Sequence, residues 1–241
     1  MNCVFCCVFN KIEYVDMFLL LAESIKMTNP DIPIVVYTST PFMYRIKSIY
    51  ANIEFRINDT YHTVDKACKA RLDLFHLMLP YNKILYLDTD CIVSGNLNQV
   101  FDLCTEDVVY TLEEGSLDIY NVNDWWGRTL FQSIDQYEDK TAFSSGVMLL
   151  NNSERMMDYF MKVQKDIADR PHTFNDQPHF VYIAFILQCY NNKALKKVVN
   201  NTMNLDFIVH HFPGTPGFAD HKLLKMRASI DYIKGKYDNF V

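Results

Sequence analysis

The sequence predicts an α/β fold built on a mainly parallel, Rossmann-like sheet that is flanked by helices. Apolar runs of strand length alternate with helix-length segments from the first residues onward. Strands separated by such long connections form βαβ units, because a parallel neighbour needs a crossover of this length. Parallel sheets of this kind are covered on both faces and bind ligands beyond the carboxyl ends of their strands.

The first half of the chain supplies a regular series of these elements. Hydrophobic patterns predict strands at 3–9, 32–39, 53–57 and 83–87. The patterns between them predict helices at 14–27, 41–50 and 65–79, the last of which stops at Pro80.

The second half is less regular. Strands are expected at 107–112 and 146–151, short strands at 196–200 and 207–212, and helices at 153–168, 174–187 and 220–234. The polar stretch between 113 and 140 reads as a long surface loop or short helices. The sequence contains neither a linker-like stretch nor an internal repeat, so residues 1–241 are expected to form a single domain.

Composition narrows the range of partners and compartments. The chain has 241 residues and a formal net charge of -6, which argues against nucleic acid or an anionic membrane as the main partner. No segment approaches the ~20 apolar residues of a membrane span, and the first residues lack the features of a signal peptide. The seven cysteines form neither a second pair nor a Cys/His cluster in the sequence, so we interpret them as reduced thiols of a cytoplasmic protein rather than zinc ligands.

Two carboxylates follow the fourth predicted strand, in the sequence ILYLDTDCIV at 84–93. If the strand stays extended through them, Asp88 and Asp90 project to the same side, because side chains alternate along a strand. Close carboxylates raise each other's pKa unless a cation neutralises them, and a hard divalent ion does so directly. The alternative is that Asp88 ends the strand and Asp90 caps the following turn.

A histidine pair near the end of the chain offers a further ligand. In IVHHFPGTPG, at 208–217, His210 and His211 would point in opposite directions along a strand, so only one of them reaches a given site. One imidazole and two carboxylates leave open positions on an octahedral ion. Diphosphate oxygens would fill these positions, and Mn²⁺ or Mg²⁺ suits this set of ligands better than Zn²⁺.

Four segments in order, ARLDLFHLMLPYNKILYLDTDCIV, FSSGVMLLN, NDQ and HFPG, resemble glycosyltransferase family 8. The resemblance implies a GT-A fold, with a nucleotide-sugar-binding half at about 1–112 and a smaller, mixed acceptor-binding half at about 113–241. It also implies a metal-dependent hexosyltransferase that uses a UDP-sugar and retains the anomeric configuration. The acceptor would be a glycan or a glycoprotein, and the oligomeric state is left open.

The resemblance assigns roles to particular residues. The metal ligands would be Asp88, Asp90 and His211, with Asp88 also approaching the donor's ribose or sugar. Among the remaining donor contacts, Val8, Asn10 and Tyr14 would hold the base, and Thr89 lies inside the D-x-D motif. The sugar and diphosphate would be contacted by Arg71, Ser144, Ser145, Gly214 and Lys222. Arg71, Asp176 and Gln177 would lie at the reacting centre.

The mechanism is left open by these residue types. In one version the acceptor attacks from the face that the leaving phosphate vacates, and this phosphate takes the acceptor's proton. In the other, an enzyme nucleophile displaces the donor first, for which Asp176 is better suited than Gln177. A metal ion neutralises the charge of the departing diphosphate in either case.

Two positions depart from the family pattern. Gly217 stands where the family usually has a lysine that reaches the diphosphate. Either Lys222 or Lys225 replaces it from the following helix, or the diphosphate lacks this cation and turnover is slow. Ser144 stands where an asparagine contacts the donor sugar, so the transferred sugar could be a hexose or a deoxyhexose such as rhamnose.

Two alternatives remain at this stage. A haloacid-dehalogenase-type phosphatase also places D-x-D after a buried strand, but Ile92 occupies a position where that site usually has Thr or Val. A non-catalytic protein that binds nucleotide sugars on the same fold would also fit, because function depends on the site rather than on the fold. The Asn-, Ile-, Lys- and Tyr-rich composition and the small size suggest an AT-rich genome, such as that of a large DNA virus acting in the cytoplasm of its host cell.

Overall fold

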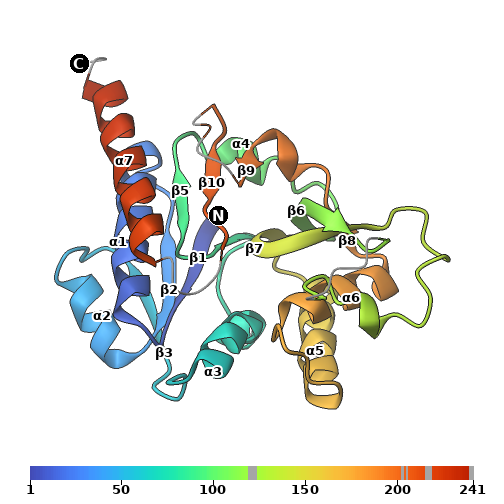
Figure 1. The fold of residues 1–241 in the computed structure, drawn as a ribbon. Coiled ribbons are helices and arrows are strands. Elements are labelled where there is room, and N and C mark those ends of the chain that lie inside the picture. Colours follow the sequence, from blue (N-terminus) through green and yellow to red (C-terminus); the bar gives the residue numbers. More distant parts are fainter. Residues whose placement is uncertain (119–123, 202–203, 205, 215–218, 239–241) are drawn as a thin grey trace.

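A central sheet organises the molecule in the computed structural model, which describes residues 1–118, 124–201, 204, 206–214 and 219–238 (Figure 1). Its seven strands follow the order β3-β2-β1-β4-β7-β6-β8. They are β1 (Asn2–Val8), β2 (Ile34–Thr38), β3 (Glu54–Ile57), β4 (Lys83–Leu87), β6 (Val109–Ser116), β7 (Thr141–Asn151) and β8 (Tyr190–Asn191). The first four strands are parallel, as the βαβ pattern predicted.

Side chains of β1 divide alternately between two cores, one on each face of the sheet. Cys3 and Phe5 pack in the core beneath the helices of the second half, whereas Val4 and Cys6 pack in the core against α1 (Ile12–Thr28). All four side chains are fully buried. This two-sided burial explains why the strand reads as an unbroken apolar run in the sequence.

The segment that was predicted as one helix over 65–79 has two parts. An α-helix, α3 (Val64–Lys69), passes into a 3-10 helix at Ala70–Leu77, and Met78 then takes a left-handed conformation with φ 48°. The tighter winding of a 3-10 helix rotates its side chains relative to an α-helical continuation. Arg71 lies in this second part and is turned into the protein interior.

The antiparallel part of the sheet is longer than predicted. β7 pairs with β4 on one side and with β6 on the other, and both pairings are antiparallel. β6 continues four residues beyond the predicted end at 112 and passes an irregularity in its pairing with β7. The extension Glu113–Ser116 is polar and less buried than the first half of the strand, so a hydrophobic pattern did not reveal it.

A smaller sheet carries the residues that follow the D-x-D motif. Its strands follow the order β5-β10-β9, with bounds β5 (Cys91–Val93), β10 (Val209–His211) and β9 (Val199–Asn200). β5 and β10 are antiparallel and place Cys91 opposite His211. β9 and β10 fall within the short strands predicted at 196–200 and 207–212, whereas β5, which directly follows the turn at Thr89 and Asp90, was not predicted.

Helices cover both faces of the central sheet. On one side α7 (Ala219–Asp238) packs along α1 and β5, and α2 (Thr40–Lys47) and α4 (Asn98–Phe101) lie nearby (Figure 1). On the other side α5 (Glu154–Asp169) and α6 (Gln177–Leu187) pack against each other. Among the described residues, none of the helices combines the length and the apolar character needed to cross a bilayer.

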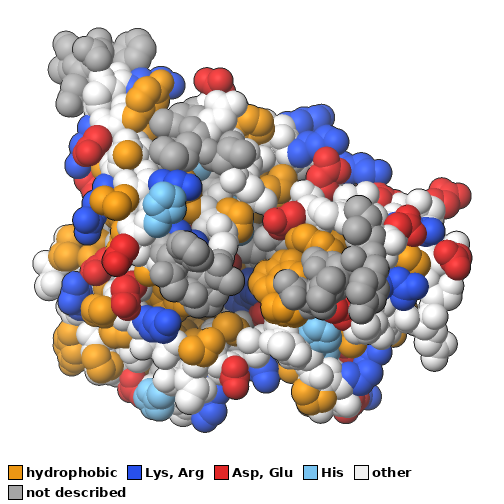
Figure 2. All heavy atoms as spheres, in the orientation of Figure 1, with side chains coloured by type: hydrophobic (Ala, Val, Ile, Leu, Met, Phe, Trp, Pro, Cys, Tyr) orange, Lys and Arg blue, Asp and Glu red, His pale blue; other side chains and the backbone are white. Residues whose placement is uncertain are grey.

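Charged side chains are mixed on the molecular face that Figure 2 displays. Lys and Arg side chains alternate with Asp and Glu side chains rather than gathering into a field of one sign. Nucleic-acid-binding surfaces concentrate positive charge on one face or stripe. The face in Figure 2 has no such single-sign field.

Candidate active site

The two carboxylates of the D-x-D motif lie at the carboxyl edge of the parallel strands. β4 ends at Leu87, and the backbone N–H of Asp88 then donates a hydrogen bond of 2.8 Å to the carbonyl oxygen of Gly146 on β7. The chain turns at Thr89 and Asp90 before β5 begins. A turn therefore separates the carboxylates, so the continuous strand considered for 84–90 is not present and strand alternation does not set their directions.

Arg71 forms a buried ion pair with Asp176. Its Nε and Nη2 atoms donate to the two carboxylate oxygens at 2.6 and 2.8 Å, and its Nη1 donates to the carbonyl oxygen of Ser145 at 2.8 Å. The guanidinium carbon also lies 5.5 and 5.2 Å from the ring centres of Tyr86 and Phe180. Burial alone would lower the pKa of Arg71, but the Asp176 carboxylate raises it well above its ordinary value.

Asp88 shares the same guanidinium at a longer distance. Its Oδ1 lies 3.6 Å from Nη1 of Arg71 and accepts a hydrogen bond of 2.5 Å from the hydroxyl of Tyr86. Burial raises the pKa of Asp88, and the Asp90 carboxylate raises it further, against the opposing effects of Arg71 and His211. A carboxylate in this environment gains from any additional cation.

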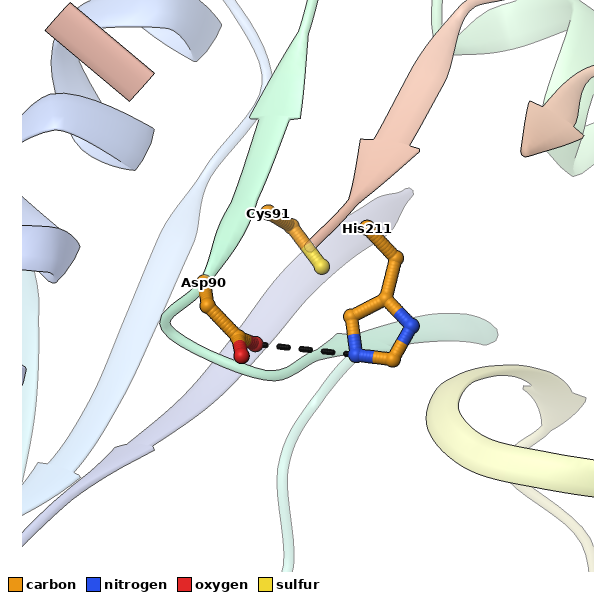
Figure 3. Close-up of side chains that lie close together, drawn as sticks. All are labelled: Asp90, Cys91 and His211. Atoms are coloured by element: carbon orange, nitrogen blue, oxygen red, sulfur yellow. Dashed lines mark ion pairs between the residues drawn. The ribbon is translucent and has the colours of Figure 1, made fainter. Parts of the chain in front are cut away.

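Asp90 faces two other partners. The Nζ atom of Lys222 lies 2.5 Å from its Oδ2, and the Nε2 atom of His211 lies 3.6 Å from its Oδ1. Figure 3 shows the Asp90 carboxylate, from the turn before β5, and the His211 ring, from β10, directed toward each other. The side chain of Asp90 is only 13% exposed, so its charge requires compensation within the protein.

The ring of His211 is held in an orientation that suits a metal ligand. Its Nδ1 lies 3.1 Å from the side-chain oxygen of Asn201, which can accept a hydrogen bond from Nδ1–H and so leave Nε2 available as a ligand for a cation beside Asp90. Gly146 gives the ring its space, because a Cβ there would lie 2.6 Å from the ring and 3.0 Å from Oδ2 of Asp88. Two carboxylates and one neutral imidazole are a suitable ligand set for Mn²⁺ or Mg²⁺.

Cys91 lies beside this set, which the sequence did not reveal. One ligand atom each of Asp90, Cys91 and His211 lies within 4.8 Å of the others (Figure 3). Burial raises the pKa of the Cys91 thiol well above its ordinary value, with the Asp90 carboxylate adding to the effect. A protonated, fully buried thiol is a neutral neighbour rather than a ligand for a hard cation.

Asp176 and Gln177, both predicted near the reacting centre, are buried, and their side chains form hydrogen bonds within the protein. The side-chain oxygen of Gln177 accepts hydrogen bonds from the backbone N–H of Ser145, at 2.9 Å, and from its hydroxyl. The side-chain amide nitrogen donates to the carbonyl oxygen of Phe143 at 2.7 Å. These contacts anchor the start of α6 to β7, and they use both polar atoms of the glutamine side chain.

Glu114 belongs to the site, although the sequence gave no indication of this. It lies on the part of β6 that extends past the predicted end, and its carboxylate is hydrogen-bonded to the side chain of Ser144. Burial raises the pKa of the Glu114 carboxyl, against the opposing effects of His211 and this hydrogen bond. The acidic pair at 113–114 could have been recognised only if the strand had been predicted to continue.

The residues expected to hold a nucleobase lie at the end of β1. Val8 is fully buried, and Asn10 follows with a positive φ of 73°. The side-chain amide nitrogen of Asn10 is buried and has no hydrogen-bond partner among the described residues. Burial raises the pKa of Tyr14, as do the nearby Cys68 and the two D-x-D carboxylates. A buried donor without an acceptor is typical of a binding site whose ligand supplies it.

Gly214 adjoins Lys222 near the end of the chain. The ammonium group of Lys222 lies 3.3 Å from the carbonyl oxygen of Gly214, which has a φ of 148°. Gly217, where the expected lysine is missing, lies outside the described residues. His210 does not join the site: its ring nitrogens contact Ser94 and Asn200, so the histidine pair divides as predicted.

A cavity of about 300 Å³ lies near residues that neighbour Arg71 and Asp176 in the sequence, although neither of these two side chains lines it. It lies between α3 and the segment that leads into α6, and it is lined by Asp65, Lys69, Ile167, Pro171, His172, Thr173 and Asn175. The lining combines charged and polar groups with two apolar side chains, a mixture that suits a hydroxylated ligand better than an apolar one.

The sequence from 50 to 215 matches the model of a protein family described as glycosyl transferase family 8. This chain belongs to that family. The matched range contains Arg71, the D-x-D motif, Asp176 and His211. Family membership argues against the phosphatase alternative. A comparison with curated protein sequences gives no match.

Solved glycosyltransferases share the fold. The galactosyltransferase LgtC, in complex with donor and acceptor sugar analogs, superposes with a TM-score of 0.63 at 16% identity, over 95% of this chain and 96% of that one. Mouse xyloside xylosyltransferase 1 gives 0.59 at 12% identity, over 90% and 100%. A glycosyltransferase involved in the glycosylation of the major capsid of PBCV-1 gives 0.54 at 14% identity, over 94% and 98%. This member of family 8 therefore has the GT-A fold.

Proposed function

We propose that this family 8 member is a metal-dependent, retaining hexosyltransferase that moves a hexose or deoxyhexose from a UDP-sugar to a glycan or protein acceptor. The observation that carries the proposal is the convergence of Asp88, Asp90 and His211 at the carboxyl edge of the parallel strands. Asp88 directly follows β4, Asp90 lies in the next turn and His211 lies on β10, and the three residues would hold Mn²⁺ or, alternatively, Mg²⁺. The bound ion would neutralise the negative charge that develops on the departing diphosphate.

The donor would lie across the carboxyl ends of β1 and β4. In this proposal, Val8, Asn10 and Tyr14 hold the uracil ring, and the unpaired amide nitrogen of Asn10 donates to it. Thr89, which is buried, lines the space between the two carboxylates. Gly214 and Lys222 approach the diphosphate.

The transferred sugar would lie between β6, β7 and the start of α6. Ser144 and Ser145 line this region together with Glu114, whose carboxylate could accept hydrogen bonds from sugar hydroxyls. The acceptor would enter through the cavity that Lys69 and Asn175 border. Residues 1–241 would work as one domain, with donor contacts mainly from 1–112 and acceptor contacts mainly from 113–241.

The contacts of the acidic side chains favour attack from the face of the leaving group. Both oxygens of Asp176 accept hydrogen bonds from Arg71, so a displacement by Asp176 would first have to break a buried ion pair. Gln177 has its amide oxygen occupied by Ser145. We therefore propose that Asp176 positions Arg71 beside the donor, and that the leaving phosphate takes the acceptor's proton.

A cytoplasmic location, which includes the cytoplasm of a virus-infected host cell, completes the proposal. All seven cysteines are free thiols, which is the state expected in a reducing compartment.

Turnover of nucleotide sugars tests the proposed function. A panel of UDP-sugars and other nucleotide sugars is incubated with the enzyme in Mn²⁺ or EDTA, and release of the nucleoside diphosphate is measured. Asp90→Asn should reduce Mn²⁺-dependent release by at least about 10³-fold, because loss of a metal-held charge costs several kcal/mol of transition-state stabilisation. Asp135→Asn, at a side chain that is 88% exposed, is the matched control.

Each outcome has a definite meaning. Full activity in EDTA, or in Asp90→Asn, would contradict the metal role. Metal-dependent UDP binding without turnover, even with oligosaccharide acceptors present, would favour the non-catalytic alternative.

A further inference from the structure

Lys222 forms an ion pair with one carboxylate oxygen of Asp90, and the imidazole of His211 lies nearer to the other. Its ammonium lies 2.5 Å from Oδ2, while Nε2 of His211 lies 3.6 Å from Oδ1 of the same carboxylate. The side chains of Lys222 and Asp90 are only 15% and 13% exposed. The lysine is therefore the main cation on the carboxylate that the proposed function assigns to a divalent ion.

The neighbouring carboxylate is neutralised in a different way. Asp88 faces Arg71, whose guanidinium is fixed by two bonds to Asp176 and one to the Ser145 carbonyl oxygen. Lys222 instead holds its charge at the end of a flexible four-carbon stem, and its other contact is a bond of 3.3 Å to the Gly214 carbonyl oxygen. The lysine can therefore leave its carboxylate with few other bonds to break.

The charge of the site changes when the proposed ligands bind. The ion-paired groups alone, which are the carboxylates of Asp88, Asp90 and Asp176 with Arg71 and Lys222, sum to one negative charge when no ligand is bound. A divalent cation would make the sum of these five groups positive, and the diphosphate of a nucleotide sugar would return it to one negative charge. Two cations on one carboxylate repel each other, so Lys222 opposes the ion until a diphosphate arrives.

We propose that Lys222 and the divalent cation occupy Asp90 alternately. Without ligand, the ammonium of Lys222 neutralises Asp90 and keeps the site closed to the ion. When cation and diphosphate bind together, the ammonium leaves Oδ2 of Asp90 and contacts the diphosphate beside the first turn of α7. This inference rests on the proposed function, and it makes Lys222 the source of coupling between metal and nucleotide.

The test measures Mn²⁺ binding in the absence of nucleotide, by titration calorimetry and by the electron paramagnetic resonance signal of free Mn²⁺. Lys222→Met removes the competing charge, so Mn²⁺ should bind at least about ten-fold more tightly than to the wild type. The affinity for UDP at saturating Mn²⁺ should fall at least about ten-fold, because the contact to the diphosphate is lost. Opposite changes in the two affinities are the specific result expected of an exchange.

A matched control distinguishes the contact between Lys222 and Asp90 from the general electrostatic effect of positive charges on α7. Arg227→Met removes one positive charge from an exposed position on α7, and should leave both affinities within about two-fold. Lys222→Gln is a second variant that retains a polar side chain of similar reach, and it should behave like Lys222→Met. A melting temperature close to that of the wild type in saturating Mn²⁺ verifies that each variant is folded.

The outcomes distinguish failure of this inference from failure of the proposed function. If Mn²⁺ binds the wild type and both Lys222 variants with equal affinity, or binds the variants more weakly, the exchange is wrong while the metal site stands. If no Mn²⁺ binds the wild type or the variants even with UDP present, the metal role in the proposed function is wrong and the exchange falls with it.

Discussion

Arg71 and Lys222 neutralise the two D-x-D carboxylates by contrasting means. Arg71 is buried, bonded at three of its nitrogen atoms, and flanked by two aromatic rings. Lys222 is tethered to the first turn of α7 and holds Asp90 mainly through a single contact of 2.5 Å. The guanidinium of Arg71 is planar and held by several partners, so it stays beside Asp88. The ammonium of Lys222 ends a flexible side chain, so it can move away from Asp90.

The largest expected effect comes from removing the buried guanidinium of Arg71. Arg71→Met leaves Asp176 buried without its partner, so the free energy of unfolding should fall by about 3–5 kcal/mol. Urea unfolding followed by circular dichroism measures this change. The exposed pair of Arg45 and Asp16 provides the control, because Arg45→Met should cost no more than about 1 kcal/mol.

A double variant separates stability from donor binding at this position. Arg71→Met combined with Asp176→Leu removes both buried charges, and should recover most of the lost stability. Binding of UDP-sugar should remain weak in the double variant, because the guanidinium is still absent. Recovery of donor binding together with stability would mean that Arg71 is purely structural.

A smaller effect is expected at the side chain that orients His211. Asn201→Ala removes the acceptor for the ring Nδ1, so the imidazole can turn and change its tautomer. The affinity for Mn²⁺ should fall by about 10–100-fold, the usual cost of losing such a support. Titration calorimetry with Mn²⁺ and UDP measures it. A variant that binds Mn²⁺ like the wild type would show that the strand alone orients the ring.

The smallest effect concerns the pH dependence of stability and α6, the helix that begins directly after Asp176. His179 on α6 is fully buried and faces Asp166, with Arg170 and His172 nearby. Burial lowers the pKa of His179, against the opposing effect of the Asp166 carboxylate. Below pH about 6.5 the unfolded chain therefore binds more protons than the folded chain, so the free energy of unfolding falls as the pH falls.

Chemical unfolding between pH 7.5 and 5 measures this contribution. His179→Gln removes the group whose pKa burial lowers, so the free energy of unfolding should fall less steeply with pH than in the wild type. His221→Gln, at an exposed position of α7, should leave the slope unchanged. An unchanged slope in His179→Gln would assign the pH dependence to other groups.

The elements of the fold differ in how well the sequence predicted them. The parallel strands β1 to β4 and the long helices were predicted to within a few residues, because burial on both faces leaves an unbroken apolar signal. The 3-10 helix that contains Arg71 and the extension of β6 were missed, since tertiary packing rather than local pattern sets their conformation. The two-residue strand β8 carries too few residues for any pattern.

The site was predicted to the extent that its residues lie in motifs. The D-x-D carboxylates, His211, Arg71 and Asp176 could be named from their segments, and the structure brings them together. Glu114, Asn201 and Cys91 could not, because their importance comes from contacts with residues that are distant in the sequence. The exact partner of Lys222 was also hidden: the sequence suggested the diphosphate, and the structure gives Asp90.

The pairing of β5 with β10 has a consequence for synthesis of the protein. Cys91 lies opposite His211, so 120 positions separate the two sides of this strand pair. A ribosome adds all of these residues after Cys91 before the imidazole exists, and the pairing then closes a loop of about 120 residues. Nascent chains and truncated products that stop short of the second strand therefore carry both D-x-D carboxylates without the imidazole that completes the proposed metal site.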